Sequence, residues 1–261
     1  RRRRPIERGG AAAVKRMWRR WLERHGYQIR RLPTRWAPWG DRLLSKPDDP
    51  FDRIFEAAEP DPRHRSRLKS PTNSKVCRCW MLKSLLETLL PLEHDAAECG
   101  VNRGLSAYVL AEYLQRSGFA APRRLQLFDT FEGTPEVDAA KDDAASIVAG
   151  TYATPYEYVV DRFRSYPFVD VVAGRIPESL GPAAERTFAF LHLDLNIYEA
   201  YRDALNFFWP RMAVPGIVVC DDYGFPGSRG ASLAVDEFAA AHEVKAVYLP
   251  TGQAALWKFR A

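Results

Sequence analysis

The chain has 261 residues, 46% of them hydrophobic, and a formal net charge of +5. This suits one α/β domain with an appendage, and no apolar run approaches the ~20 residues of a membrane-spanning helix. Arg1–Gly10 is basic without an apolar segment behind it, and the four cysteines suit a reducing compartment. We therefore expect a cytoplasmic protein without a secretory signal.

Positive charge is concentrated at the start of the chain. Residues 1–35 carry 13 Lys and Arg against two Glu, a net +11, which leaves −6 for residues 36–261. Residues 12–31 have the pattern of a basic amphipathic helix, whose apolar face would hold Val14, Met17, Trp18, Trp21 and Leu22. Such a helix can lie on an anionic inner membrane face, or it can pack on its own domain or a second subunit; both interpretations stay open. Nothing beyond this extension supports nucleic-acid binding.

A proline-rich linker is predicted at residues 33–50. The predicted organisation is therefore a basic helical extension with a linker at residues 1–67, followed by the main domain at residues 68–261. We also expect a homo-oligomer.

Helices and strands alternate in the main domain. The predicted helices span residues 74–90, 104–116, 155–165, 198–209 and 227–242, and the predicted strands span residues 95–99, 124–128, 168–172, 188–193, 217–220, 245–249 and 254–259. This alternation predicts a doubly wound, mostly parallel sheet. Residues 129–154 are too long for an ordinary connection, which predicts an active-site lid.

Two of the predicted strands end in carboxylates and lie one helix apart. The first ends at Asp194, and the second ends at Asp221 and Asp222. A right-handed crossover would bring these side chains together at the carboxyl edge of the sheet, where ligands bind. Clustered acids repel one another unless a cation lies among them, and oxygen ligands suit Mg²⁺ or Ca²⁺. The alternative is a loop with solvated acids.

The turn after the predicted strand at residues 95–99 contains two glycines. It reads Glu98-Cys99-Gly100-Val101-Asn102-Arg103-Gly104-Leu105-Ser106, which differs from the dinucleotide fingerprint. Glycine lets the backbone approach a ligand, and the following helix offers unpaired N–H groups. The next strand ends at Asp129, followed by Thr130, where nucleoside-binding α/β folds place a carboxylate on ribose hydroxyls. Together these features indicate a nucleoside-containing ligand.

Five segments in order make the sequence similar to the macrocin O-methyltransferase family of sugar O-methyltransferases that use S-adenosylmethionine. They are Glu98–Gly104, Phe128–Pro135, Leu193-Asp194, Phe208–Gly216 and Asp221–Gly224, and the resemblance covers roughly residues 68–259. It implies a class I methyltransferase fold with seven strands, the last of them antiparallel.

The resemblance also implies roles for individual residues. Cofactor-binding positions would be Glu98, Gly100, Gly104, Ser106, Asp129 and Thr130, with Asp129 on the ribose. Asp194, Asp221 and Asp222 would bind Mg²⁺, which would hold two neighbouring hydroxyls of the acceptor and lower the pKa of one. The acceptor would be a sugar hydroxyl of a glycosylated metabolite or a surface glycan.

One position departs from the family pattern. Relatives often have a second aspartate, the proposed general base, where this chain has Asn196, and an amide cannot take a proton at neutral pH. The metal alone could acidify the hydroxyl, a base could come from the lid or from His192, or activity could be lost. His192 is favoured as a core residue. Asp194 and Asn196 are therefore the predicted catalytic positions.

Two alternatives to a sugar O-methyltransferase remain open. They are a catechol-type O-methyltransferase and a non-catalytic cofactor-binding scaffold in glycan assembly.

Overall fold

The computed structural model describes residues 28–31, 42–45, 49–59, 75–91, 93–143 and 145–260. The chain divides into two compact units, Arg1–Phe51 and Asp52–Ala261. The predicted boundary at residues 67 and 68 lies outside the described residues and stays a prediction.

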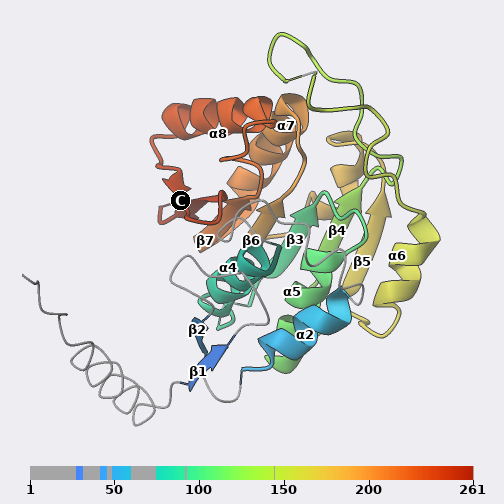
Figure 1. The fold of residues 1–261 in the computed structure, drawn as a ribbon, viewed down its shortest axis with the longest axis vertical. Coiled ribbons are helices and arrows are strands. Elements are labelled where there is room, and N and C mark those ends of the chain that lie inside the picture. The colour runs from blue at the N-terminus through green and yellow to red at the C-terminus, as the bar shows by residue number, and fades with distance from the viewer. Residues whose placement is uncertain are drawn as a thin grey trace, which may run out of the picture. The chain divides into compact units, whose positions relative to one another are not determined.

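A short antiparallel pair forms in the first unit. It joins β1 (Gln28–Arg31) to β2 (Arg42–Ser45), with Gln28 opposite Ser45 (Figure 1). The last residues of the predicted amphipathic helix are therefore a strand, and the predicted linker contains a strand. Pairing between segments accounts for the difference, because periodicity within one segment does not reveal it. The rest of that predicted helix lies outside the described residues.

The second unit contains a seven-stranded sheet. Its strands are β3 (Asp95–Cys99), β4 (Leu125–Asp129), β5 (Val169–Ala173), β6 (Phe188–Leu193), β7 (Met212–Cys220), β8 (Val247–Tyr248) and β9 (Ala254–Lys258). The order is β5-β4-β3-β6-β7-β9-β8, and only the pairs that involve β9 are antiparallel. The predicted doubly wound, mostly parallel sheet with an antiparallel last strand is confirmed.

Helices cover both faces of this sheet (Figure 1). Those in the part of the chain that the structure describes are α2 (Phe51–Ala58), α4 (Lys75–Glu87), α5 (Leu105–Arg116), α6 (Tyr156–Phe163), α7 (Tyr198–Phe208) and α8 (Arg229–Ala241), with 3-10 turns η1 (Glu178–Ala183) and η2 (Trp209–Arg211). Since α5 and α7 lead to strands in opposite directions along the sheet, right-handed crossovers place them on opposite faces. The connections therefore diverge between β3 and β6, which is where α/β sheets bind ligands.

The central strands are buried on both faces, as parallel strands between helices are. Every residue of β3 and β6 is buried, and Phe188 of β6 meets Phe208 of α7 edge to face at 5.1 Å. α7 and α8 pack against each other on this core. The packing of the sheet thus holds the ends of its strands in fixed positions.

Several differences from the predicted elements are local. β7 begins at Met212, before the predicted start, because Met212 pairs with Phe188 across a register shift in β6. β8 is shorter than predicted, with both residues exposed, and η1 was not predicted. None of these differences moves a predicted site residue. Among the described residues, no helix is long and apolar enough to cross a membrane.

Candidate functional site

The sheet register brings the predicted site residues to one edge. Cys99 at the end of β3 pairs with Phe128 of β4 and with Leu193 of β6, and Leu193 pairs with Cys220 of β7. The ladder continues past the strands, because Asp194 donates its backbone N–H to Cys99 at 2.8 Å. The residues that follow these strand ends therefore lie side by side.

Gly100 is required where β3 and β6 approach. Its φ is +87°, and a Cβ at this position would lie 1.8 Å from the carbonyl oxygen of Asp194. No other residue type combines this left-handed backbone with so close an approach. The glycine therefore sets the distance between the turn that is predicted to bind the cofactor and the strand ends that carry Asp194, Asp221 and Asp222. We call these strand ends the acidic edge.

Asp129 holds the glycine-containing turn. Its Oδ2 accepts the backbone N–H groups of Val101 and Asn102, each at 2.7 Å, and its Oδ1 accepts that of Phe131 at 2.8 Å. Thr130 closes the following turn, since its hydroxyl donates to Gly133 at 2.9 Å. The carboxylate is thus held in place by the backbone at the spot predicted for ribose binding.

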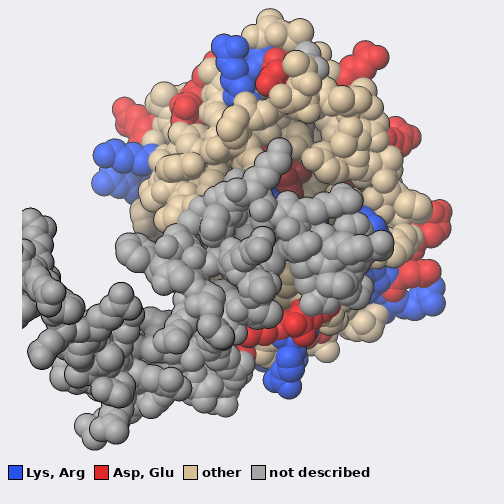
Figure 2. Space-filling view, in the orientation of Figure 1, with Lys and Arg blue, Asp and Glu red and all other residues tan. Residues whose placement is uncertain are grey.

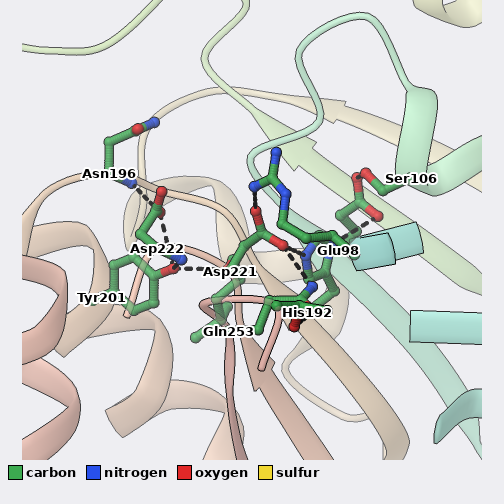
Figure 3. A network of polar contacts seen from close by, with 11 residues as sticks. Glu98, Ser106, His192, Asn196, Tyr201, Asp221, Asp222 and Gln253 are labelled. Carbon is green, nitrogen blue, oxygen red and sulfur yellow. Dashed lines mark hydrogen bonds and ion pairs between the residues drawn. The ribbon is translucent and has the colours of Figure 1, made fainter. Parts of the chain in front are cut away.

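A chain of polar side chains connects the glycine-containing turn to the acidic edge (Figure 3). Ser106 donates to Glu98 Oε1 at 2.8 Å, and Glu98 Oε2 lies 3.1 Å from His192 Nδ1. His192 Nε2 lies 3.4 Å from Asp221 Oδ1, which also accepts a hydrogen bond from Gln253 at 2.7 Å. His192 is thus placed between two carboxylates, deep in the sheet.

Asp222 lies on the other side of this cluster (Figure 3). Its Oδ2 accepts the backbone N–H of Asn196 at 2.8 Å and the hydroxyl of Tyr201 at 3.0 Å. Asn196 has φ 63°, a left-handed conformation that Asn adopts more readily than most residues. Its main chain therefore positions Asp222, and Asn196 is also one of the residues that line the cavity.

Arg78 of α4 is an unpredicted member of the site. Its Nη1 forms an ion pair with Asp221 Oδ2, and its guanidinium lies 5.2 Å from the ring centroid of Phe225. Both oxygens of Asp221 are thus in contact with the chain's own donors.

These contacts set the protonation of the acids in opposite directions. Burial alone raises the pKa of Asp221, but Arg78, His192 and Gln253 outweigh it and lower the pKa to about 2. Burial and the charge of Asp221 raise the pKa of Asp222 to about 6, and burial with both neighbouring aspartates raises that of Asp194 well above its usual range. Burial lowers the pKa of His192, but Glu98 and Asp221 outweigh it and raise the pKa to about 10.

A cavity of about 460 Å³ opens at this edge. Of the predicted site residues, Gly100, Asp129, Thr130, Asp194, Asn196 and Asp222 line it, whereas Glu98, Gly104, Ser106 and Asp221 do not. One cavity thus joins the predicted cofactor side to the predicted acceptor side. On the face shown in Figure 2, acidic and basic side chains of the described residues are interspersed along the outline of the molecule.

The predicted lid lines the same cavity. Ser146, Ile147, Val148, Thr151 and Tyr152 contribute to its wall. The segment is fastened at Asp142, which is buried and accepts the first N–H of α7, that of Tyr198, at 2.8 Å. The described residues of this segment therefore form part of the cavity wall.

The donor set fits a divalent cation poorly. Arg78, Gln253 and His192 surround the carboxylate of Asp221, and among the described residues no group of three His, Cys, Asp or Glu side chains is arranged to hold a metal. The Mg²⁺ site at Asp194, Asp221 and Asp222 stays a prediction, and we assign no step to a metal.

Sequence reasoning missed Arg78, Tyr201 and Gln253. Tyr201 follows Tyr198 by one helical turn, and Gln253 precedes the last strand, so both had a spacing that could have suggested them. Arg78 had no such signal, because its helix lies far from the acids in the sequence.

Comparison with known proteins gives a family and the same fold. The macrocin-O-methyltransferase (TylF) family matches residues 81–258. The 8-demethyl-8-(2,3-dimethoxy-alpha-L-rhamnosyl)-tetracenomycin-C 4'-O-methyltransferase of Streptomyces olivaceus is 34% identical over 161 residues, which are 58% of this chain and 61% of that protein. Demethyldecarbamoylnovobiocin O-methyltransferase of Streptomyces niveus is 30% identical over 160 residues, which are 58% of this chain and 60% of that protein. The chain thus spans about three fifths of the length of these curated relatives.

The solved structure of the O-methyltransferase NovP has a TM-score of 0.67 with this chain at 22% identity, over 80% of this chain and 98% of that one. At this identity the likeness concerns the fold, which is that of the predicted seven-stranded sheet. The family match extends over more than half of the residues. The chain belongs to the macrocin-O-methyltransferase (TylF) family.

Proposed function

We propose that this protein is an S-adenosylmethionine-dependent O-methyltransferase that acts on a sugar hydroxyl with a neighbouring hydroxyl. The observation that carries the proposal is the single cavity whose wall includes both the Gly100–Asp129 side and the Asp194–Asp222 side. Family membership and the names of the relatives, which are O-methyltransferases of glycosylated natural products, support the same reaction.

The cofactor would lie against the glycine-containing turn. Gly100 leaves room for close approach, Asn102 and Asp129 line the wall, and the loop after β5, Gly174–Ile176, lines it beyond the end of β4. When bound, the cofactor supplies an activated methyl group on a sulfonium. The chain's part is to hold the hydroxyl oxygen in line with that methyl group, and such alignment is a large source of acceleration.

The acceptor would lie against Asp194, Asn196 and Asp222. Carboxylates accept hydrogen bonds from hydroxyls, and the amide of Asn196 can both donate and accept, so together they suit two neighbouring hydroxyls. Asp222 is the proposed proton acceptor, since it lines the cavity and its pKa, raised to about 6, is close to neutral pH. His192 does not line the cavity, which favours its interpretation as a core residue.

Transfer of a labelled methyl group from S-adenosylmethionine to a panel of acceptors tests this function. Rhamnosides with adjacent hydroxyls should be methylated, and Asp222→Asn should lower kcat by about 10²-fold, as expected for loss of a general base. Asp161→Asn is the control, because this carboxylate is exposed on α6 and does not line the cavity. Methylation of catechols but of no glycoside would mean that the acceptor is a catechol and not a sugar.

Asn196 favours one second candidate, a non-catalytic scaffold that binds the cofactor in glycan assembly. Asn196→Asp separates the two, because Asp keeps the backbone N–H that Asp222 accepts and tolerates the left-handed conformation. Little change in turnover supports the enzyme as described. A large gain would mean that the natural chain is catalytically impaired.

A further inference from the structure

Arg78 reaches the acidic edge from a different part of the fold. It lies on α4, whereas the three aspartates follow β6 and β7. Its side chain lines the cavity, and its ion-pair partner Asp221 is almost fully buried, with 3% of the side chain exposed. The cation is therefore part of the cavity wall and is shielded from bulk water on the Asp221 side.

The pair leaves Asp221 little capacity for another cation. Arg78 holds Oδ2, while Gln253 donates to Oδ1 at 2.7 Å and His192 lies 3.4 Å from the same oxygen. A divalent ion that used Asp221 would have to displace the guanidinium. Arginine stays charged at any pH the fold survives, so the displaced charge would remain beside the metal.

The guanidinium also has an unused donor. Its Nε is buried and has no hydrogen-bond acceptor among the described residues. Buried donors without partners are rare in native proteins and often mark a site that another molecule completes. An oxygen atom of a ligand in the cavity can supply that acceptor.

We infer that Arg78 supplies the positive charge at the Asp194–Asp221–Asp222 cluster in place of a divalent cation, and that this cluster binds a divalent ion only when the guanidinium is removed. The inference rests on the proposed function for the identity of the reaction, but the occupancy of the cluster is independent of it. Arg78 is then a positioning residue that holds Asp221, and methyl transfer needs no added metal.

Binding of Mn²⁺ to the full chain tests this directly. It is measured as the loss of the electron paramagnetic resonance signal of the free ion. Arg78→Met should bind one Mn²⁺ per chain at least tenfold more tightly than the natural chain, and adding Asp221→Asn to it should abolish that binding. Arg78→Lys keeps the positive charge, so this variant should bind Mn²⁺ as weakly as the natural chain does. Lys75→Met is the matched control, since Lys75 lies on the same helix and lines the same cavity, yet pairs with Glu59 at 3.7 Å.

Tight Mn²⁺ binding by the natural chain would overturn the inference whether or not the variants fold. So would an Arg78→Met chain that folds, as judged by its circular dichroism, and gains no Mn²⁺ binding. Calorimetry with S-adenosylmethionine in EDTA keeps the two claims apart. Absence of cofactor binding in every chain would reject the proposed function and leave the Mn²⁺ result standing.

Discussion

At the scale of single residues, the site depends on backbone positions as much as on side chains. Gly100 has both a positive φ and a neighbour that a Cβ would strike, whereas Gly118 has only the positive φ and Gly181 has neither. These three glycines separate conformational strain from steric collision within one chain.

Gly100→Ala should destabilise the protein by about 3 kcal/mol or more, because it adds a collision with Asp194 to backbone strain of about 1–3 kcal/mol. Gly118→Ala should cost only the strain, about 1 kcal/mol, and Gly181→Ala should stay within about 0.5 kcal/mol of the natural chain. Urea unfolding of the three variants provides the measurement. Equal effects of Gly100→Ala and Gly118→Ala would show that β3 and β6 separate readily.

His192 makes stability depend on pH. Its pKa is raised from 6.5 to about 10 in the folded chain, so between these values the folded state holds a proton that the unfolded state has lost. The stability gained from this proton is complete below about pH 6.5 and is lost as pH rises towards about 10, at up to about 1.4 kcal/mol per pH unit.

Urea unfolding between about pH 7 and pH 8.5 should therefore show a falling free energy of unfolding, with a smaller slope in His192→Gln. The upper limit matters because the buried thiols of Cys79, Cys99 and Cys220 have raised pKa values and act in the same direction above about pH 8.5. Parallel slopes in the two chains would mean that His192 is neutral in the folded state.

At the scale of elements, the lid and α7 stabilise each other. The side chain of Asp142 accepts the first N–H of α7, whose own preceding residue, Ile197, provides no side-chain cap. Gly230 of α8 makes room, since a Cβ there would lie 1.7 Å from Asp142 Oδ1. A helix is thus capped from a distant segment of the sequence.

Asp142→Ala should release the lid, with about fivefold faster hydrogen exchange in residues 136–154, because a lost cap costs about 1 kcal/mol. Asp142→Asn should retain most of the protection, since its amide oxygen can still accept. Glu136→Ala, an exposed change in the same segment, is the control. Unchanged exchange in Asp142→Ala would assign the order of the lid to its other contacts.

Much of this architecture follows from sequence patterns. β6 begins and ends where its apolar run predicted, because strands buried on both faces have a distinct composition. β3 also has its predicted bounds, although it contains Asp95 and Glu98. The ion pair of Arg78 with Asp221 could not be predicted, since it depends on how α4 packs. The role of the Asn196 backbone was also hidden, because the residue type suggested a lost carboxylate and not a left-handed turn.

At the scale of the whole molecule, charge separates the chain into two parts. The net +11 of residues 1–35 contrasts with the acidic remainder. Most of those basic residues lie outside the described ranges, so contact with an anionic membrane stays a prediction from composition.

Sedimentation with vesicles tests that prediction. The full chain should bind vesicles that contain phosphatidylglycerol at low salt and dissociate at high salt, because exposed charges are screened. Removal of residues 1–35 should abolish binding, and neutral phosphatidylcholine vesicles are the control. Unchanged binding after the removal would reject a membrane role for this segment.

Binding of S-adenosylmethionine tests the central claim most directly. Calorimetric titration of the full chain should show saturable one-to-one binding. Asp129→Ala should weaken it at least tenfold, because this carboxylate lines the cavity and holds the Val101 and Asn102 N–H groups, whereas the exposed change Asp161→Ala should not. Absence of binding by the natural chain, with and without Mg²⁺, would contradict the account.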